Sequence, residues 1–426
     1  MATVVNILFL SPYPPYPPYG GGTMRIYQLL RGLATHHNVT CLTFVTDKQA
    51  EDELGPLRKI CRVVTVHGPP PRTLVQRAWT TLTSRYPDMA LRNASTAYAD
   101  TLRHLLTTTH FDVIQAESIE MADYLFIADN INQPYRSVSS KKTAHPLLIL
   151  DQFNAEFVLQ QRAFLTDIRK LKRWYAAGYS FAQWHKLWHY ERRLLQRSDA
   201  VVAVSDEDRH TLHRIWSKAT IQVVPNGVDT SHFHRQVLRH EHAGWFSFGQ
   251  PTLVFSGTLD FRPNIDALIW FAYEVLPHIR NAIPTIQLLV VGKRPTPAIQ
   301  QLATDKTIHI VGPVTDTRPY IAGAEVYIVP MRIGGGVRLK LLEALSLETP
   351  VVSTSMGAEG VTGLHHNAQC WLADEPYQFA QTVVRVLQDS TTRQQVGAAG
   401  RRLVQQSYDW SVIVPKLEML YTSMIR

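Results

Sequence analysis

The residues with the clearest chemical potential lie between positions 330 and 350. This stretch reads Pro-Met-Arg-Ile-Gly-Gly-Gly-Val-Arg-Leu-Lys-Leu-Leu-Glu-Ala-Leu-Ser-Leu-Glu-Thr-Pro, a pattern that predicts a strand end, a triple-glycine turn and a helix. Glycines allow backbone N–H groups to turn toward an anion, and a helix N-terminus adds the positive end of its dipole. The pattern therefore predicts a phosphate site around Gly334, Gly335, Gly336 and Val337.

The same stretch supplies the charges that a diphosphate requires. Arg332 and Arg338 offer planar guanidinium donors and Lys340 offers a compact charge, so the diphosphate could be neutralised without a metal. Glu343 shares a helix face with Lys340 and is placed to accept hydrogen bonds from ribose hydroxyls. The alternative is that Lys340 and Glu343 form an ordinary surface pair on a helix that binds no ligand.

Further segments, each weak by itself, recur in a fixed order around this stretch. They are Phe111-Asp112-Val113-Ile114-Gln115-Ala116-Glu117, Ala200-Val201-Val202-Ala203-Val204-Ser205, Val224-Pro225-Asn226-Gly227-Val228-Asp229, Phe255-Ser256-Gly257-Thr258-Leu259 and Leu289-Val290-Val291-Gly292. Through their order and spacing, the sequence resembles the family 4 glycosyltransferases of the GT-B fold. The resemblance implies an α/β protein of two Rossmann-like, doubly wound domains that face an interdomain cleft.

Length and patterning agree with two domains. The chain has 426 residues, more than one hydrophobic core usually serves, and short β-branched runs alternate with longer amphipathic stretches. We expect an N-terminal domain over residues 1–225 and a C-terminal domain over 226–407. The resemblance implies that the first binds the acceptor, that the second binds a nucleotide sugar, and that a helix in 408–426 packs back on the first. We interpret the polar stretch from the boundary to Gln250 as a linker, not a core segment.

The strand expectations follow from the β-branched runs. In the first half they cover residues 4–10, 39–44, 62–66, 112–115, 147–150, 200–204 and 221–224. In the second half they cover residues 253–256, 286–291, 308–311, 326–329 and 351–354.

A second glycine cluster, Gly20-Gly21-Gly22, follows the first expected strand and opens a helix. It is not a dinucleotide fingerprint, because the Gly-x-Gly-x-x-Gly pattern is absent. The resemblance implies that Gly21 and Gly22 approach the donor diphosphate and the acceptor. The alternative is a loop that only caps the helix.

The first domain departs from the family pattern at Phe153, where relatives commonly have a histidine facing the reacting sugar. A phenyl ring cannot act as a base, so either that role is dispensable or Asp151, Asn154 or Glu156 takes it. In the alternative reading, Asp151 and Asn154 merely cap the helix that begins near Glu156.

The second domain departs at two places. Many relatives have an arginine directly after the glycine at Gly257, whereas this chain has Thr258, with Arg262 as a candidate substitute. Gly335 stands where many relatives have a glutamate that touches the donor hexose. The donor sugar therefore cannot be transferred from relatives, and two alternatives to a transferase stay open: an inactive GT-B binding or scaffold protein, and a nucleotide-sugar epimerase.

Most of the excess charge lies in residues 162–197. The chain has a net charge of +8, and this segment carries nine cations and two acids among several aromatic residues. That composition is typical of helices on an anionic membrane surface, and the alternative is packed core helices with solvated cations. Nucleic acid is the poorer partner, because no binding motif accompanies the segment.

Compartment and cofactor follow from what the sequence lacks. Its three cysteines are far apart and outside metal-binding spacings, and no run of about eighteen apolar residues occurs. We expect a cytoplasmic protein, peripheral at the inner face of a membrane, with no metal and no cofactor apart from the donor substrate.

The predicted activity is that of a retaining, metal-independent, hexosyltransferase-like enzyme of polysaccharide or lipid-linked sugar synthesis. Its acceptor is a sugar, a lipid-linked acceptor or another small acceptor. The candidate catalytic residues are Asp151, Asn154, Arg338 and Lys340. The candidate donor-binding residues are Gly21, Gly22, Gly257, Thr258, Arg262, Arg332, Gly334, Gly335, Gly336, Val337 and Glu343.

Overall fold

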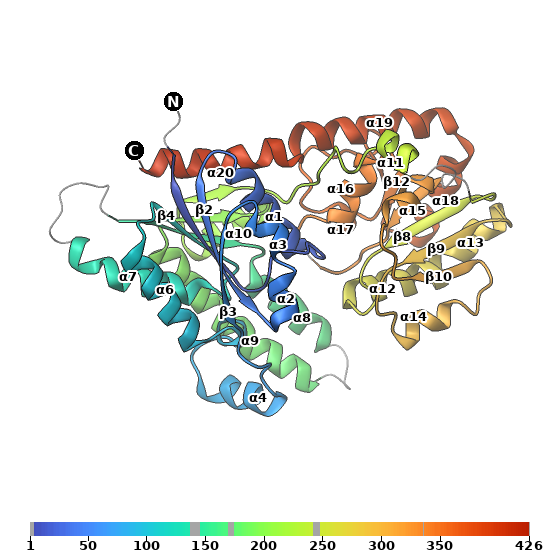
Figure 1. Ribbon diagram of the computed structural model, residues 1–426. Helices are drawn as coiled ribbons and strands as arrows, with labels where there is room; N and C mark the ends of the chain where they lie inside the picture. The colour runs from blue at the N-terminus through green and yellow to red at the C-terminus, as the bar shows by residue number, and fades with distance from the viewer. Residues whose placement is uncertain (1–3, 137–144, 169–173, 242–247, 335, 426) are drawn as a thin grey trace. The chain divides into compact units, whose positions relative to one another are not determined.

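The chain folds into two compact units, as the computed structural model shows for residues 4–136, 145–168, 174–241, 248–334 and 336–425 (Figure 1). Unit 1 comprises Met1–Pro225 together with Ile413–Arg426, and unit 2 comprises Asn226–Val412. Each unit is a parallel sheet covered by helices, and each is described below by itself.

Unit 1 is built on a parallel sheet of seven strands in the order β3-β2-β1-β4-β5-β6-β7. Its central strands are buried on both faces and rich in Val, Ile and Leu, as expected for a parallel sheet with helices on each side. The bounds are β1 (Asn6–Ser11), β2 (Asn38–Val45), β3 (Arg62–His67), β4 (Val113–Glu117), β5 (Leu147–Gln152), β6 (Ala200–Ala203) and β7 (Ile221–Val223).

The helices of unit 1 include one from the far end of the sequence. In chain order they are α1 (Gly21–Leu33), α2 (Lys48–Asp52), α3 (Gly55–Arg58), α4 (Leu74–Thr83), α5 (Asp88–Arg92), α6 (Thr96–Thr108), α7 (Ala122–Arg136), α8 (Glu156–Asp167), α9 (Trp174–Arg197) and α10 (Asp206–Ile215). Helix α20 (Trp410–Ile425) joins them from Ile413 onward. It packs closely on α1, because a Cβ added at Gly32 would lie 2.5 Å from a methyl carbon of Val414.

Unit 2 is a parallel sheet of six strands in the order β10-β9-β8-β11-β12-β13. The strands are β8 (Thr252–Ser256), β9 (Gln287–Val291), β10 (Ile308–Gly312), β11 (Val326–Val329), β12 (Val351–Ser353) and β13 (Trp371–Leu372). The helices are α11 (Arg235–Glu241), α12 (Arg262–Trp270), a π-helical turn (Phe271–Val275), α13 (Leu276–Ala282), α14 (Pro297–Leu302), α15 (Arg318–Gly323), α16 (Leu339–Ser346), α17 (Ser355–Ala358), α18 (Pro376–Gln388) and α19 (Ser390–Ser407).

The expected strands are all present, and one interpretation is wrong. The stretch after Pro225 is more than a linker, because Leu238 on α11 is fully buried in the core of unit 2. The backbone N–H of Val228 also donates to the carbonyl of Tyr408 at 2.9 Å. The stretch is polar on average, so its composition did not indicate that a few of its apolar residues pack into the core. The two-residue strand β13 was not expected.

Each sheet has one place where neighbouring strands are connected to opposite sides. In unit 1 this topological switch lies between β1 and β4, and in unit 2 it lies between β8 and β11. Loops that leave the carboxyl ends of such strands diverge and form a crevice, which is where ligands bind in open α/β sheets. Both glycine clusters of the sequence lie in these loops. Within the described residues, no helix is both long and apolar enough to cross a membrane.

Candidate donor and acceptor sites

The site in unit 2 begins with two closely packed backbone segments at the ends of β8 and β9. Gly257 has φ of +149°, a conformation that glycine adopts readily. A Cβ added at Gly292 would lie 1.8 Å from the carbonyl oxygen of Gly257. Glycine is therefore required at position 292 for the loop after β8 to cross the end of β9.

Lys340, on the first turn of α16, lies over this loop. Its Nζ donates to Asn264 Oδ1 at 3.0 Å and lies 4.0 Å from the ring centroid of Phe255. Asn264 in turn donates from Nδ2 to the carbonyl of Thr258 at 2.8 Å. Burial, with a smaller contribution from the nearby Arg338 charge, lowers the pKa of Lys340 to about 7. An anion at this place would restore the charged form of Lys340.

Glu343 lies one turn further along α16 and is half-buried. Burial raises the pKa of its carboxyl to about 7, while the Lys340 charge opposes that shift. The neighbouring Tyr327 is fully buried, and its hydroxyl lies 2.6 Å from Ser256 Oγ. Lys340 and Glu343 are thus set in a partly dry environment, unlike an ordinary surface pair.

The glycine turn before α16 is shaped by positive φ angles and by a folded-back arginine. Gly334 has φ of +124° and Gly336 has φ of +72°. A Cβ added at Gly334 would lie 2.6 Å from Nη2 of Arg338. On the other side, a Cβ added at Gly360 would lie 3.2 Å from the backbone nitrogen of Val337. Gly335 lies outside the described residues.

The N-terminus of α16 directs backbone donors toward the same place. The first N–H groups of an α-helix have no carbonyl partner within the helix, and the dipole makes this end positive. Lys340 and Arg338 add side-chain charges beside these amides, and Asn264 fixes the lysine. Such an arrangement can bind a diphosphate and stabilise negative charge on a leaving oxygen.

Two other residues that were predicted to bind the donor nucleotide sugar, Arg332 and Arg262, lie on or next to α12 and not on α16. Arg332 forms a two-point ion pair with Asp266 on α12, with Nε–Oδ2 and Nη2–Oδ1 distances of 3.1 and 2.9 Å. Its guanidinium also lies 5.5 Å from the ring centroid of Trp270. Arg262 is the first residue of α12, two positions before Asn264. The Arg332 charge is therefore already balanced by Asp266.

In unit 1, the second glycine cluster lies at the start of α1. Gly21 is the first residue of that helix. A Cβ added at Gly22 would lie 2.0 Å from the Tyr13 hydroxyl and 3.3 Å from the ring of Phe153. Gly22 is thus needed for two aromatic side chains of the same unit to pack. Phe153, for which the family resemblance implied a histidine, belongs to this aromatic contact.

Asp151, at the carboxyl end of β5, is fully buried and paired. Arg25 on α1 donates to both of its oxygens, from Nε at 2.7 Å and from Nη2 at 2.9 Å. The same guanidinium donates to the carbonyl of Pro225 at 3.2 Å. Burial and the Asp151 charge raise the pKa of the adjacent Glu117 well above its usual value. Asp151 therefore does not cap α8, whose N-cap residue is Ala155.

Asn154 lies beside the start of α8 and is half-buried. Its side-chain amide donates to Glu156 at 3.2 Å. Burial raises the pKa of Glu156 to about 7, and the hydrogen bond from Asn154 opposes that shift. Asn154 and Glu156 form a second polar pair at the same edge of the unit 1 sheet, apart from the Arg25–Asp151 pair.

The structure brings together some of the predicted residues and adds others. Asn264, which was not predicted from the sequence, links Lys340 to Thr258, and the Arg338 guanidinium lies close to Gly334. Arg25 and Glu117, the partners of Asp151, were also missed. Asn264 could have been found from its place at the start of the helix that follows the Gly257 loop. The Arg25 pairing had no local signal.

Two parallel α/β units, each with one topological switch point in its sheet, define the GT-B class of glycosyltransferase folds. The match to "Glycosyltransferase Family 4" covers residues 19–232, and the match to "Glycosyl transferases group 1" covers residues 250–389. The chain belongs to glycosyltransferase family 4.

Solved structures share the fold. Sucrose-phosphate synthase of Thermosynechococcus elongatus superposes with a TM-score of 0.69 at 18% identity, covering 99% of both chains. Anabaena HepE, in complex with UDP-glucose, gives a TM-score of 0.62 at 14% identity, covering 98% of this chain and 100% of that one.

Curated relatives match over part of their length. The chain is 29% identical, over 53% of its own length, to a protein of Mycobacterium tuberculosis named GDP-mannose-dependent alpha-(1-6)-phosphatidylinositol monomannoside mannosyltransferase. It is 28% identical, over 38% of its length, to an uncharacterized protein of the cps region of Klebsiella pneumoniae. These matches span 62% and 44% of the relatives' own lengths.

Proposed function

We propose that this protein is a retaining glycosyltransferase that moves a hexose from a nucleotide-diphosphate sugar to an acceptor. The observation that carries the proposal is the group formed by the Gly334–Gly336 turn, the start of α16, Arg338 and Lys340, with Asn264 holding the lysine. Family membership supports the same reaction class. The donor diphosphate is proposed to bind in unit 2.

In the proposed mechanism, electrostatics assist departure of the nucleotide diphosphate. Lys340 gains a proton or keeps one when the diphosphate arrives, because the negative charge of the anion opposes the effect of burial on its pKa. Arg338 and the backbone N–H groups at the start of α16 are proposed to stabilise the charge that develops on the leaving oxygen. These groups supply positive charge from the chain itself, so the proposal needs no metal ion or other cofactor.

Glu343 is proposed to accept hydrogen bonds from the ribose hydroxyls. Its position one turn beyond Lys340 on α16 fits a sugar attached to the bound diphosphate. Burial raises its pKa to about 7, so the ionised carboxylate, which is the stronger hydrogen-bond acceptor, becomes more populated as the pH rises through neutrality.

The acceptor is proposed to bind unit 1, at the edge that carries Asn154 and Glu156. Asp151 is proposed to be a positioning residue, because Arg25 occupies both of its oxygens. The name of the M. tuberculosis relative includes phosphatidylinositol monomannoside, a sugar attached to a lipid. This name supports a lipid-linked acceptor over a free polysaccharide. A cytoplasmic protein that contacts the inner face of a membrane would meet such an acceptor.

A two-stage experiment tests the proposal. Thermal shift with UDP, GDP, UDP-glucose and GDP-mannose identifies the nucleotide, and incubation with the stabilising sugar then follows release of free nucleotide diphosphate. The expected result is slow release without acceptor, faster release with a lipid-linked sugar, and an α-linked product from an α-linked donor. Nucleotide binding with no release under any condition would indicate an inactive binding protein. An isomerised nucleotide sugar would indicate an epimerase.

A further inference from the structure

Helix α4 has its polar and apolar faces reversed relative to an ordinary surface helix. At about 100° per residue, Leu74, Val75, Ala78, Trp79 and Leu82 fall within an arc of about 140°. A surface helix normally turns such a stripe toward the core. Here none of the ten residues of α4 is buried. Leu74 and Val75 are each 79% exposed, Trp79 is 67% exposed and Leu82 is 84% exposed.

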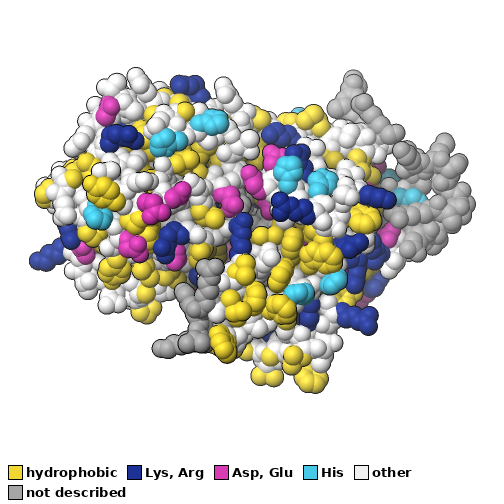
Figure 2. Space-filling model, turned by 180° about the vertical axis from the view of Figure 1, so that it is seen from behind, with side chains coloured by type: hydrophobic (Ala, Val, Ile, Leu, Met, Phe, Trp, Pro, Cys, Tyr) yellow, Lys and Arg dark blue, Asp and Glu magenta, His cyan; other side chains and the backbone are white. Residues whose placement is uncertain are grey.

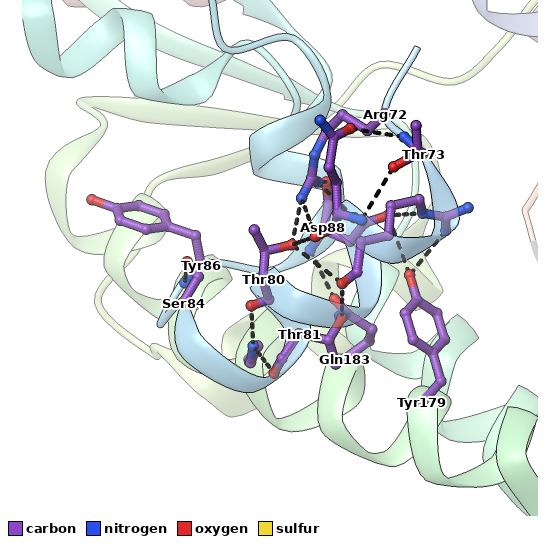
Figure 3. Close-up of polar contacts among 12 residues, drawn as sticks. Arg72, Thr73, Thr80, Thr81, Ser84, Tyr86, Asp88, Tyr179 and Gln183 are labelled. Atoms are coloured by element: carbon purple, nitrogen blue, oxygen red, sulfur yellow. Dashed lines mark hydrogen bonds and ion pairs between the residues drawn. The ribbon is translucent and has the colours of Figure 1, made fainter.

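The polar face of α4 is the one that contacts the rest of unit 1 (Figure 3). Arg72 and Arg77 both bind the buried carboxylate of Asp88, at 2.7 and 2.9 Å, and Tyr179 on α9 donates to it at 3.2 Å. Gln183 on α9 donates to Thr81 at 3.0 Å. Charged and polar bonds therefore hold the helix in a defined orientation that presents its apolar side chains outward.

Lys186 and a capping box at the start of the helix fix that orientation further. Lys186 Nζ donates to the carbonyl of Thr81 at 2.6 Å. Thr73 and Gln76 exchange side-chain and backbone hydrogen bonds at the N-terminus of α4. The exposure of the apolar face is thus maintained by a specific network and is not the fraying of a loosely attached segment.

Further apolar side chains are exposed on α9, which α4 contacts, and at the end of α8, which packs against α9. Leu165 and Ile168 near the end of α8, and Trp174, Tyr175 and Phe181 in the first turns of α9, are all exposed. Figure 2 shows hydrophobic side chains gathered at the lower end of unit 1. We call the exposed apolar residues of 74–82, 165–168 and 174–181 the apolar surface of unit 1.

The exposed charges in the segments that form this surface are positive, whereas Arg72 and Arg77 are paired with the buried Asp88. The described residues 72–86, 162–168 and 174–186 contain five cations and a single acid, Asp167, which is buried. Arg85 and Arg162 are exposed at the rim. Exposed leucine and tryptophan surrounded by arginine and lysine are the composition of a helix that lies in the interface of an anionic bilayer. Within these described ranges the surface has no exposed acid. A protein partner would therefore find no negative group on it that could set the partner's orientation.

We propose that α4, together with the exposed ends of α8 and α9, inserts its apolar side chains into the headgroup region of an anionic membrane. This adds α4 to the basic and aromatic segment 162–197 singled out in the sequence, and it limits the contact within that segment to the exposed ends of α8 and α9. Much of that segment is engaged elsewhere: Arg197 pairs with Asp129 at 3.0 Å, and Arg192 and Arg193 lie over aromatic rings. Arg169, Lys170, Lys172 and Arg173 lie outside the described residues.

Vesicle binding by matched variants tests the proposal. The triple variant Leu74→Ser, Trp79→Ser and Leu82→Ser removes exposed apolar side chains, so its melting temperature should stay near that of the wild type. The control is Tyr273→Ser, Tyr377→Ser and Met419→Ser, three similarly exposed positions outside the apolar surface. The wild type and the control should sediment with vesicles of phosphatidylcholine and phosphatidylglycerol. The triple variant should bind these vesicles at least about tenfold more weakly than the wild type.

Two further measurements separate insertion from charge attraction and from self-association. Brominated lipids should quench tryptophan fluorescence of the wild type, and Trp79→Phe should remove part of that quenching. Salt at ~0.5 M should weaken binding without abolishing it, since the apolar part is not screened. Equal vesicle binding by wild type and triple variant, or none by the wild type, overturns the proposal. A wild-type dimer that the triple variant converts to a monomer would instead assign this surface to a second copy of the chain.

Measuring nucleotide binding by the same variants distinguishes a failure of the membrane proposal from a failure of the proposed reaction. The apolar surface contains no residue of the unit 2 donor site, so all variants should bind nucleotide like the wild type. Vesicle binding without any nucleotide binding would therefore contradict the proposed reaction and leave the membrane surface standing.

Discussion

Lys340 makes the contacts that most directly link the sequence to a diphosphate site. Replacing it with alanine removes a charge-assisted contact, which should weaken binding of the nucleotide diphosphate by about 1.5–3 kcal/mol. Isothermal titration measures the loss. Lys306→Ala, which removes an exposed lysine elsewhere in unit 2, is the matched control and should bind normally. Normal binding by Lys340→Ala would show that the diphosphate binds elsewhere.

The lowered pKa of Lys340 predicts that nucleotide binding takes up a proton. In the free protein this lysine loses its proton as the pH rises through about 7. A bound diphosphate raises that pKa, so the complex holds more protons than the free protein above neutrality. Affinity should therefore fall as the pH rises from about 7 to 9. Titrations in buffers of different ionisation enthalpy measure the uptake, and Lys340→Ala should remove it; a pH-independent affinity would contradict the assignment.

The Arg25–Asp151 pair predicts a large asymmetry between single and double replacement. Arg25→Met leaves the fully buried Asp151 without its two-point partner, beside Glu117, which should cost about 3–5 kcal/mol of unfolding free energy. Replacing Asp151 with leucine in the same variant should recover most of the loss. Arg103→Ala breaks an exposed pair with Asp100 and should change stability by less than about 1 kcal/mol. Chemical denaturation measures all three, and a mild effect of Arg25→Met alone would argue against a structural role.

At the scale of elements, the loop after β8 depends on the absence of a side chain at Gly292. An added Cβ would overlap the carbonyl oxygen of Gly257, so Gly292→Ala should force the strand ends apart and lower the stability of unit 2 by about 1–3 kcal/mol or more, the range of overpacked cores. Gly178→Ala is the opposite case, because this glycine is exposed within α9 and nothing lies within 4 Å of an added Cβ. It should stabilise α9 by about 0.5–1 kcal/mol. Thermal unfolding compares the two, and equal melting temperatures would contradict the packing argument.

The elements that sequence patterns could predict are those whose signals are local. The long parallel strands are continuous apolar runs, and the glycine turn with Lys340 and Glu343 lies within one short stretch. Asn264 and Lys340 are 76 positions apart, and Arg25 and Asp151 are 126 apart, so only the folded chain brings them together. Helix α4 shows another limit. Its periodicity defines an apolar face but does not say whether that face turns to the core, because that depends on Asp88 and α9.

At the scale of the whole molecule, a segment at one end of the sequence stabilises the unit formed by the other end. Tyr421 on α20 is fully buried in unit 1, where its hydroxyl donates to Gln115 on β4. Unit 1 is therefore completed only when the chain has passed through unit 2 and returned. Lys340, Arg338 and Asn264, which carry the proposed diphosphate site, all belong to unit 2, so we expect the stability of each unit to respond to different changes.

This separation predicts two thermal transitions that can be moved independently. Nucleotide at about 100 times its dissociation constant should stabilise unit 2 by about 2.7 kcal/mol and raise its transition by several degrees. Tyr421→Ala should lower only the other transition, because truncating a buried aromatic side chain costs about 3–5 kcal/mol. Phe379→Ala, the matched change at a fully buried position of unit 2, should lower the transition that nucleotide raises. Differential scanning calorimetry measures both. If Tyr421→Ala and Phe379→Ala shift the same transition, the units unfold as one body and their independence is wrong.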